Sequence, residues 1–251
     1  GIGRDVRADQ SAASCADKRA YKHFVRMGRL SDLPDDPDGR YDRIPELHFS
    51  GVEVLAHEFG HYWLAAADYA PAGGKQSCLL RGLAANGKEG MCSGYEVSAF
   101  TVHWSFYFAN GGSLLYGSNI IDLGNGRFEA RYAKPHFTPF DQYLMGLRRP
   151  ADVPPFFVVG KSSSAPSDSA RYPVAPGKVA VLQGKRRPVT VDDVIRAMGP
   201  RKPSADPCHW TGAFAILHAP GEPPSAQEIA KVEAYRKRWE AFYSWATQGR
   251  G

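Results

Sequence analysis

The sequence predicts an α+β fold, organised as a single unit of 251 residues. Capping signals at several positions predict helices, and short apolar runs bounded by turn residues predict strands. A hydrophobic content of 43% with 23% charged residues is typical of a chain that buries a substantial core. Along this unit we distinguish a turn-rich segment (1–49), a motif-rich region (50–150) and a C-terminal α/β portion (151–251).

The first predicted helix begins after Ser50. The run Ser50-Gly51-Val52-Glu53 has the form of a capping box, in which the serine hydroxyl and the glutamate each satisfy a backbone amide of the first turn. No proline interrupts Val52 to Ala67, and apolar residues recur there at helical spacing, so we expect a helix seated in the core. Residues 43–49, just before it, predict an edge strand.

Further elements follow in chain order. A second helix is expected over 95–108, before Asn110-Gly111-Gly112, and a third has Thr138 as its N-cap, Pro139 in its first turn and Gly146 at its end. Strands are expected over 156–159, 179–182 and 211–218, and a capped helix over 190–198. A second capping box, Ser225 to Glu228, opens a final helix whose apolar stripe we expect in the core: Ile229, Val232, Tyr235, Trp239, Phe242 and Ala246.

The charge distribution argues against two classes of partner. The 31 Lys and Arg residues outweigh the 26 Asp and Glu residues by a net +5, but they are dispersed, so we expect no nucleic-acid partner. No apolar run approaches the roughly 18 residues that span a bilayer, so we expect no membrane segment. Because Gly1 to Asp5 lacks the apolar core of a signal peptide, we expect a mature or excised fragment. We also expect the protein to be a monomer.

The four cysteines form no CxxC pair, and their even number and wide spacing suit two disulfides. Of the three possible pairings we favour Cys78–Cys92 with Cys15–Cys208, each stabilising by about 2–4 kcal/mol. Such bonds predict an oxidising compartment, that is, a secreted or periplasmic protein. The alternative is four buried thiols in a cytosolic protein.

The strongest motif is HEFGH, residues 57–61, inside the first predicted helix. One helical turn places His57 and His61 on one face, about 6 Å apart along the axis, so both imidazoles can reach a single Zn²⁺. Glu58 lies beside them, one residue off the ligand line. Its carboxylate can approach a water on the metal without occupying the metal, which is the geometry of a general base.

With these residues the chain resembles the zincin metallopeptidases, whose active-site helix carries HExxH as two zinc ligands and a catalytic glutamate. The resemblance covers about Ser50 to Ala67 and implies a two-lobed α+β unit with this helix lining a cleft. The succession of HEFGH, His103-Trp104-Ser105 and Asp141-Gln-Tyr-Leu-Met-Gly-Leu is also similar to a group of predicted secreted bacterial peptidases, over roughly Gly51 to Phe157.

A catalytic zinc site needs a third protein ligand. We favour Asp141, because Thr138-Pro139-Phe140-Asp141 is similar to the aspzincin element GTxxDxxYG, whose aspartate binds zinc. The match departs at Phe137, which stands in place of glycine, and at Tyr143, which comes two residues after the aspartate instead of three. Tyr143 is then a candidate donor to the oxyanion of the tetrahedral intermediate.

Three other residues compete for the third ligand position. His103 is chemically as good a ligand as His57 and His61, with a structural or transition-state-stabilising role as its alternative. Glu96 could bind zinc from a following helix. Asp68 lies seven residues past His61, and on an unbroken helix it would be about 10 Å further along the axis, out of reach.

The sequence therefore predicts a secreted zinc endopeptidase that hydrolyses protein or peptide substrates through a zinc-activated water, with Glu58 as general base. Two alternatives stay open. One is a non-catalytic binding module on a zincin-like scaffold, and the other is a zinc amidase with a non-protein substrate. Four protein ligands around the metal would favour the first alternative, because catalysis needs an open position.

Overall fold

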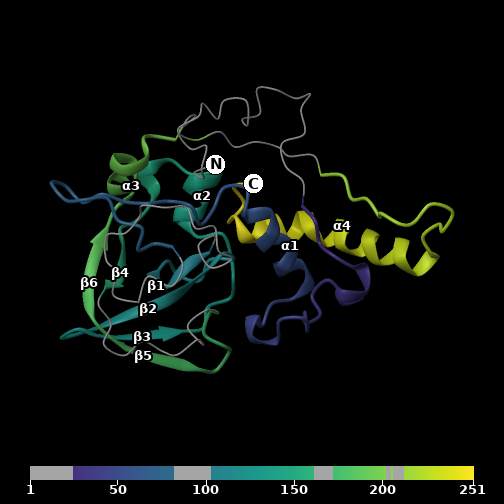
Figure 1. Ribbon diagram of the computed structural model, residues 1–251, viewed down its shortest axis with the longest axis horizontal. Helices are drawn as coiled ribbons and strands as arrows, with labels where there is room; N and C mark the ends of the chain where they lie inside the picture. The colour runs from purple at the N-terminus through teal and green to yellow at the C-terminus, as the bar shows by residue number, and fades with distance from the viewer. Residues whose placement is uncertain (1–24, 82–102, 161–171, 202–204, 206–211) are drawn as a thin grey trace.

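The computed structural model describes residues 25–81, 103–160, 172–201, 205 and 212–251, and it confirms that the fold combines helices with a mixed sheet (Figure 1). Its elements in chain order are η2 (Leu30–Asp32), η3 (Pro45–Leu47), α1 (Gly51–Gly60), β1 (Trp104–Ala109), β2 (Tyr116–Gly124), β3 (Arg127–Arg131), α2 (Pro139–Met145), η4 (Pro150–Asp152), β4 (Phe156–Gly160), β5 (Val179–Gln183), β6 (Lys185–Val189), α3 (Val191–Met198) and α4 (Ala226–Ala246).

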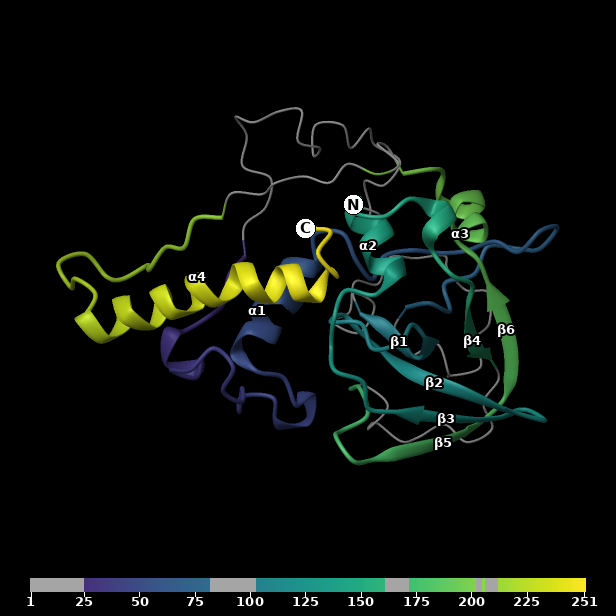
Figure 2. The ribbon, with the colours of Figure 1, turned by 180° about the vertical axis from the view of Figure 1, so that it is seen from behind.

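The six strands form one sheet in the order β5-β3-β2-β1-β4-β6. The β1 and β2 strands pair in parallel, and the other neighbours pair antiparallel. The two outermost strands, β5 and β6, are separated in sequence only by Gly184. The sheet must therefore curl until its two edges approach each other, and Figure 2 shows this curvature.

Four capping boxes observed in the structure confirm four of the five predicted helix starts. The side chains of Ser50, Thr138, Thr190 and Ser225 each accept a hydrogen bond from the N3 amide, and the acidic N3 side chain accepts from the N-cap amide. These local signals were sufficient because each box satisfies amides that have no partner within the helix. The predicted strands β4 and β5 are confirmed as well.

Other predicted elements differ from the structure. The helix expected to reach Ala67 ends at Gly60, and part of the helix expected over 95–108 is the strand β1. Nearly every residue of β1 is buried, so it lacks the polar alternation that identifies a strand. The edge strand expected over 43–49 contains η3 instead, and residues 212–218 of the strand expected over 211–218 have no regular structure.

The β2–β3 hairpin was missed although its turn carries a strong signal. Gly124 pairs with Arg127, so Asn125 and Gly126 form a two-residue turn, and both have positive φ, 52° and 73°. Asn-Gly is the preferred sequence of such a turn, because both central residues must adopt the left-handed region.

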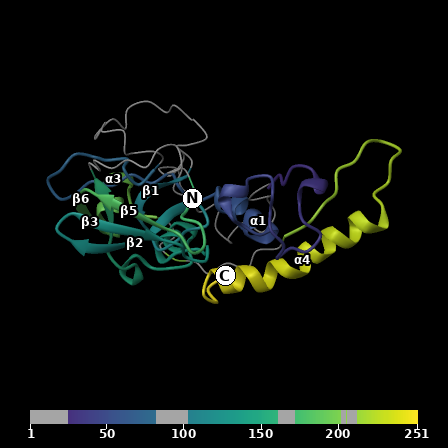
Figure 3. The same ribbon diagram turned by 90° about the horizontal axis from the view of Figure 1, so that it is seen from below.

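The helices α1 and α4 pack against each other beside the sheet (Figures 1 and 3). The ring of Phe59 contacts Trp239 at 5.2 Å and Tyr243 at 5.6 Å between centroids, and a continuous apolar core extends from these helices to the strands. The stripe predicted for α4 is buried at Phe242 but not at Ile229, which is 52% exposed. The start of α4 projects away from the sheet (Figure 3).

Two other expectations concern membrane segments and disulfides. Within the described ranges, none of the helices combines the length and apolar character needed to cross a bilayer. The proposed disulfides involve Cys15, Cys92 and Cys208, which lie outside the described residues.

Candidate metal site

The helix α1 and the residue that follows it bring the first two histidines together. His57 is in the last turn of α1, and His61 retains right-handed helical geometry as the C-cap, with its amide donating to the His57 carbonyl at 3.3 Å. One helical turn therefore still separates the two rings, although the helix is shorter than predicted. Their Nε2 atoms lie 3.1 Å apart.

The third imidazole of the group belongs to His103, at the start of β1. His103 immediately precedes that strand, and its Nε2 lies 3.1 Å from the Nε2 of His57. One ligand atom from each of the three histidines lies within 4.8 Å of the others, a grouping that could hold a metal ion. His57 is buried, whereas His61 and His103 are partly buried.

These distances are compatible with a shared cation as well as with hydrogen bonds. With Zn–N bonds of about 2.0–2.1 Å, two ligand nitrogens of a tetrahedral site are about 3.3–3.4 Å apart. The Nε2 of His57 has two other Nε2 atoms at 3.1 Å, but a neutral imidazole nitrogen has one lone pair with which to accept one N–H. Hydrogen bonding therefore explains one of the two contacts well, and a common ion explains both.

The tautomer of His57 is fixed by a backbone carbonyl. Its Nδ1 is 2.6 Å from the Leu114 oxygen, and since a carbonyl can only accept, Nδ1 carries the hydrogen. The Nε2 lone pair then faces His61 and His103. Burial, together with these two rings, holds the pKa of His57 well below 6.5, so it is neutral and able to bind a metal at neutral pH.

Glu58 follows His57 on α1 and is partly buried. Burial raises the pKa of its carboxyl group above 4.5. Among the described residues, none donates a hydrogen bond to this carboxylate, and its negative charge acts electrostatically on Tyr41 and Tyr116. A desolvated carboxylate without a fixed donor is a better proton acceptor than one in water.

Tyr116 forms an aromatic wall of the site. Its ring stacks on His103 with centroids 4.2 Å apart and lies 5.1 Å from His57. Its backbone φ of 74° is rare for a bulky residue and costs of order 1–3 kcal/mol, a strain often found at functional sites. The sequence did not distinguish Tyr116 from the other aromatic residues of this region, because its contacts with His57 and His103 join residues that lie far apart along the chain.

The structure does not bring Asp141 to the histidines. Asp141 is fully buried on α2, where Oδ1 accepts from the Trp104 indole at 2.9 Å and Oδ2 accepts from the amide and hydroxyl of Thr138, both at 2.9 Å. Burial raises the pKa of Asp141, and hydrogen bonds, that of Ser113 first, oppose the rise. Both its oxygens accept from protein donors, and the group that could hold a metal ion consists of His57, His61 and His103, without Asp141.

Two other predicted site residues, Tyr143 and Asp68, are not part of the group formed by the three histidines. Tyr143 stacks on Phe140, and its hydroxyl accepts from the Arg201 amide at 3.4 Å, so its contacts do not support an oxyanion role. Asp68 forms an ion pair with Arg81 at 2.8 Å. Glu96 lies outside the described residues.

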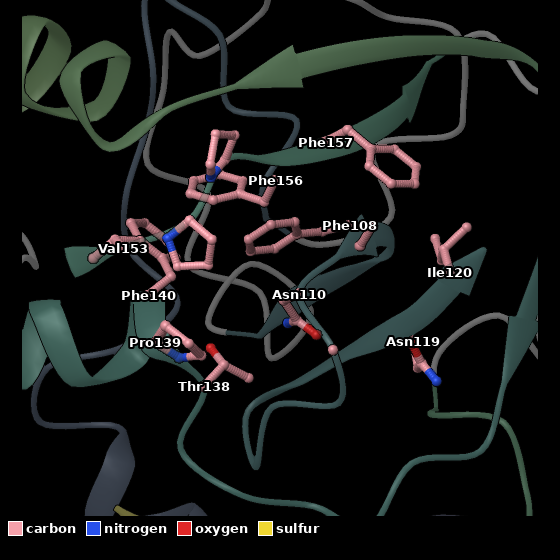
Figure 4. A pocket seen from close by; sticks show the side chains of 14 residues that line it. Phe108, Asn110, Asn119, Ile120, Thr138, Pro139, Phe140, Val153, Phe156 and Phe157 are labelled. Atoms are coloured by element: carbon pink, nitrogen blue, oxygen red, sulfur yellow. The ribbon is translucent and has the colours of Figure 1, made fainter. Parts of the chain in front are cut away.

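An apolar cavity of about 260 Å³ lies between the sheet and the start of α2 (Figure 4). The rings of Phe108, Phe140 and Phe156 line it, together with Asn110 and Thr138. None of the three histidines contributes to its lining.

Comparison with family models, with curated proteins and with solved structures finds no match to this chain.

Proposed function

We propose that this protein is a secreted, zinc-dependent endopeptidase with a two-lobed, zincin-like organisation. His57, His61 and His103 would hold the metal, and Glu58 would act as general base. The observation that carries the proposal is the convergence of three Nε2 atoms, with His57 held in the tautomer that directs its lone pair toward the other two rings. Extracellular location is supported by the four widely spaced cysteines.

The donor set fits zinc. Three neutral nitrogen ligands from one helix and a neighbouring strand form the ligand set of several catalytic zinc sites, in which a fourth position serves water or substrate. When bound, zinc supplies a Lewis acid that polarises a carbonyl oxygen and lowers the pKa of water. This assignment makes His103 a ligand, a role for which it competed with Asp141 in the sequence, in place of the transition-state-stabilising alternative, and it gives Asp141 and Tyr143 no direct part in the chemistry.

The chain's own residues divide the remaining work. Glu58 would accept the proton of the attacking water and return it to the departing amine, and burial raises its pKa towards the range in which one group can do both. The Leu114 carbonyl keeps the His57 ring oriented, and the Tyr116 ring packs over His57 and His103 and excludes water from one side.

Replacing Glu58 tests the proposal. The Glu58→Gln variant should bind one equivalent of zinc and lose hydrolysis of a fluorogenic peptide library and of casein, because glutamine cannot accept the proton. The exposed residue Glu222 provides the matched control, and Glu222→Gln should retain full activity. Undiminished hydrolysis by Glu58→Gln, or wild-type protein that binds no zinc, would contradict the proposal.

A further inference from the structure

The buried carboxylate of Asp141 needs an explanation other than zinc binding. It lies at 0% exposure and accepts hydrogen bonds from the Trp104 indole and from the amide and hydroxyl of Thr138, and the nearby Ser113 hydroxyl favours its charged form. Burying a carboxylate in a protein interior is costly, and these donors stabilise its charged form. Helix capping alone accounts for the contacts with Thr138 but not for those with Trp104 and Ser113.

Trp104, which donates to Asp141, and Ser113, which lies near it, belong to the two segments that build the histidine site. Trp104 follows His103 directly in the chain and is the first residue of β1. Ser113 is bonded covalently to Leu114, whose carbonyl accepts from Nδ1 of His57 at 2.6 Å. Asp141 therefore connects the neighbour of one metal-ligand candidate to the neighbour of the group that orients another.

Backbone hydrogen bonds join these two segments into one unit. The amide of Trp104 donates to the Leu115 carbonyl at 2.9 Å, and the amide of Tyr116 donates to the Ser113 carbonyl at 3.0 Å. The second bond closes a turn, residues 113–116, that also carries the Tyr116 ring stacked on His103. A displacement of Trp104 would thus shift the adjacent His103, and a displacement of Ser113 would shift the adjacent Leu114 and, through this turn, Tyr116.

We propose that Asp141 is a positioning residue of the metal site, which holds His103 and the carbonyl partner of His57 in the arrangement that binds zinc. The inference rests on the proposed function for the identity of the metal. Outer groups that orient metal ligands typically change metal affinity by about 10–100-fold when they are replaced.

The chain contains a matched control for the capping role. At the start of α3, Asp193 accepts from the amide and hydroxyl of Thr190 at 2.9 and 3.0 Å, which reproduces the contacts of Asp141 with Thr138. Asp193 otherwise pairs with Arg196, on its own helix. Asparagine keeps one of the two acceptor oxygens, so either replacement perturbs the helix cap to a similar degree, but only Asp141→Asn also disturbs the link to Trp104.

The experiment compares zinc affinity, by competition with a chromophoric chelator, in wild type, Asp141→Asn and Asp193→Asn. We expect affinity to fall about 10–100-fold in Asp141→Asn and to stay within about threefold in Asp193→Asn. Trp104→Phe, which keeps the ring and loses one donor to Asp141, serves if Asp141→Asn does not fold, and it should lower affinity in the same direction. Equal affinity in wild type and these site variants would overturn the inference.

A second readout uses the zinc-free protein. The Nδ1 proton of His57, held by the Leu114 carbonyl, should give a slowly exchanging imidazole N–H signal in wild type and in Asp193→Asn. In Asp141→Asn the signal should exchange rapidly or disappear, whereas its persistence would overturn the positioning role. Wild-type protein that shows this signal but binds no zinc would refute the proposed function and leave the positioning of His57 supported.

Discussion

Removing the His103 imidazole is the most direct test of the ligand set, because the sequence alone favoured Asp141 for the third position. In the structure, Nε2 of His103 lies 3.1 Å from Nε2 of His57. Both carboxylate oxygens of Asp141 accept hydrogen bonds from protein donors. We therefore expect His103→Ala to lose a first-sphere ligand.

The magnitude follows from the ligand count. Zinc binds structural sites of four protein ligands with about 10–16 kcal/mol, that is, about 2.5–4 kcal/mol per ligand. Losing one ligand should weaken zinc binding about 10²- to 10³-fold. In the zinc-free protein the substitution removes the ring stack with Tyr116, which contributes about 0.5–1.5 kcal/mol of unfolding free energy, and the contact with Nε2 of His57.

Two measurements separate these effects. Chelator competition gives the zinc affinity, and urea unfolding in the presence of a strong chelator gives the stability of the zinc-free protein. His218 is exposed on a loop, so His218→Ala controls for the removal of any imidazole. If His103→Ala binds zinc within threefold of wild type while Asp141→Ala does not bind it at all, the ligand assignment made from the structure is refuted.

Two further predictions concern the packing and the protonation of the same helix. A methyl group at Gly60 would lie 2.4 Å from Cδ2 of the fully buried Leu115. Gly60→Ala should therefore lower the unfolding free energy by about 1–2 kcal/mol, because the cost of overpacking exceeds the gain from the better helix propensity of alanine. In a Leu115→Ala background the same change should be neutral or stabilising, and an identical cost in both backgrounds, measured by chemical denaturation, would exclude this clash. Burial lowers the pKa of His57 below 6.5, so the unfolded chain binds a proton at this residue more readily than the folded protein does. In the zinc-free protein, neutral His57 therefore contributes fully to the unfolding free energy above pH 6.5. This contribution is lost as the pH falls towards the folded-state pKa. Urea unfolding between pH 7.5 and 5 should show this decline in wild type and a smaller one in His57→Gln; equal slopes would contradict it.

Local sequence signals predicted the parts of the fold that depend on near neighbours. Each capping box joins residues three positions apart, and the confirmed starts of α1, α2, α3 and α4 all rest on one. The errors occurred where tertiary burial decides the conformation. The β1 strand is buried almost throughout, and the Gly60 end of α1 is set beside Leu115, which lies far away in the sequence.

The candidate site shows the same division. The sequence by itself determined that His57 and His61 share a helical face with Glu58 beside them, because a spacing of four residues is nearly one turn of a helix. Only the tertiary structure decided that His103 joins them and that Asp141 accepts a hydrogen bond from Trp104, the residue that follows His103. The contacts responsible join residues 46, 57 and 37 positions apart, and no periodicity encodes such distances, since they arise when the sheet and α1 pack around a common core.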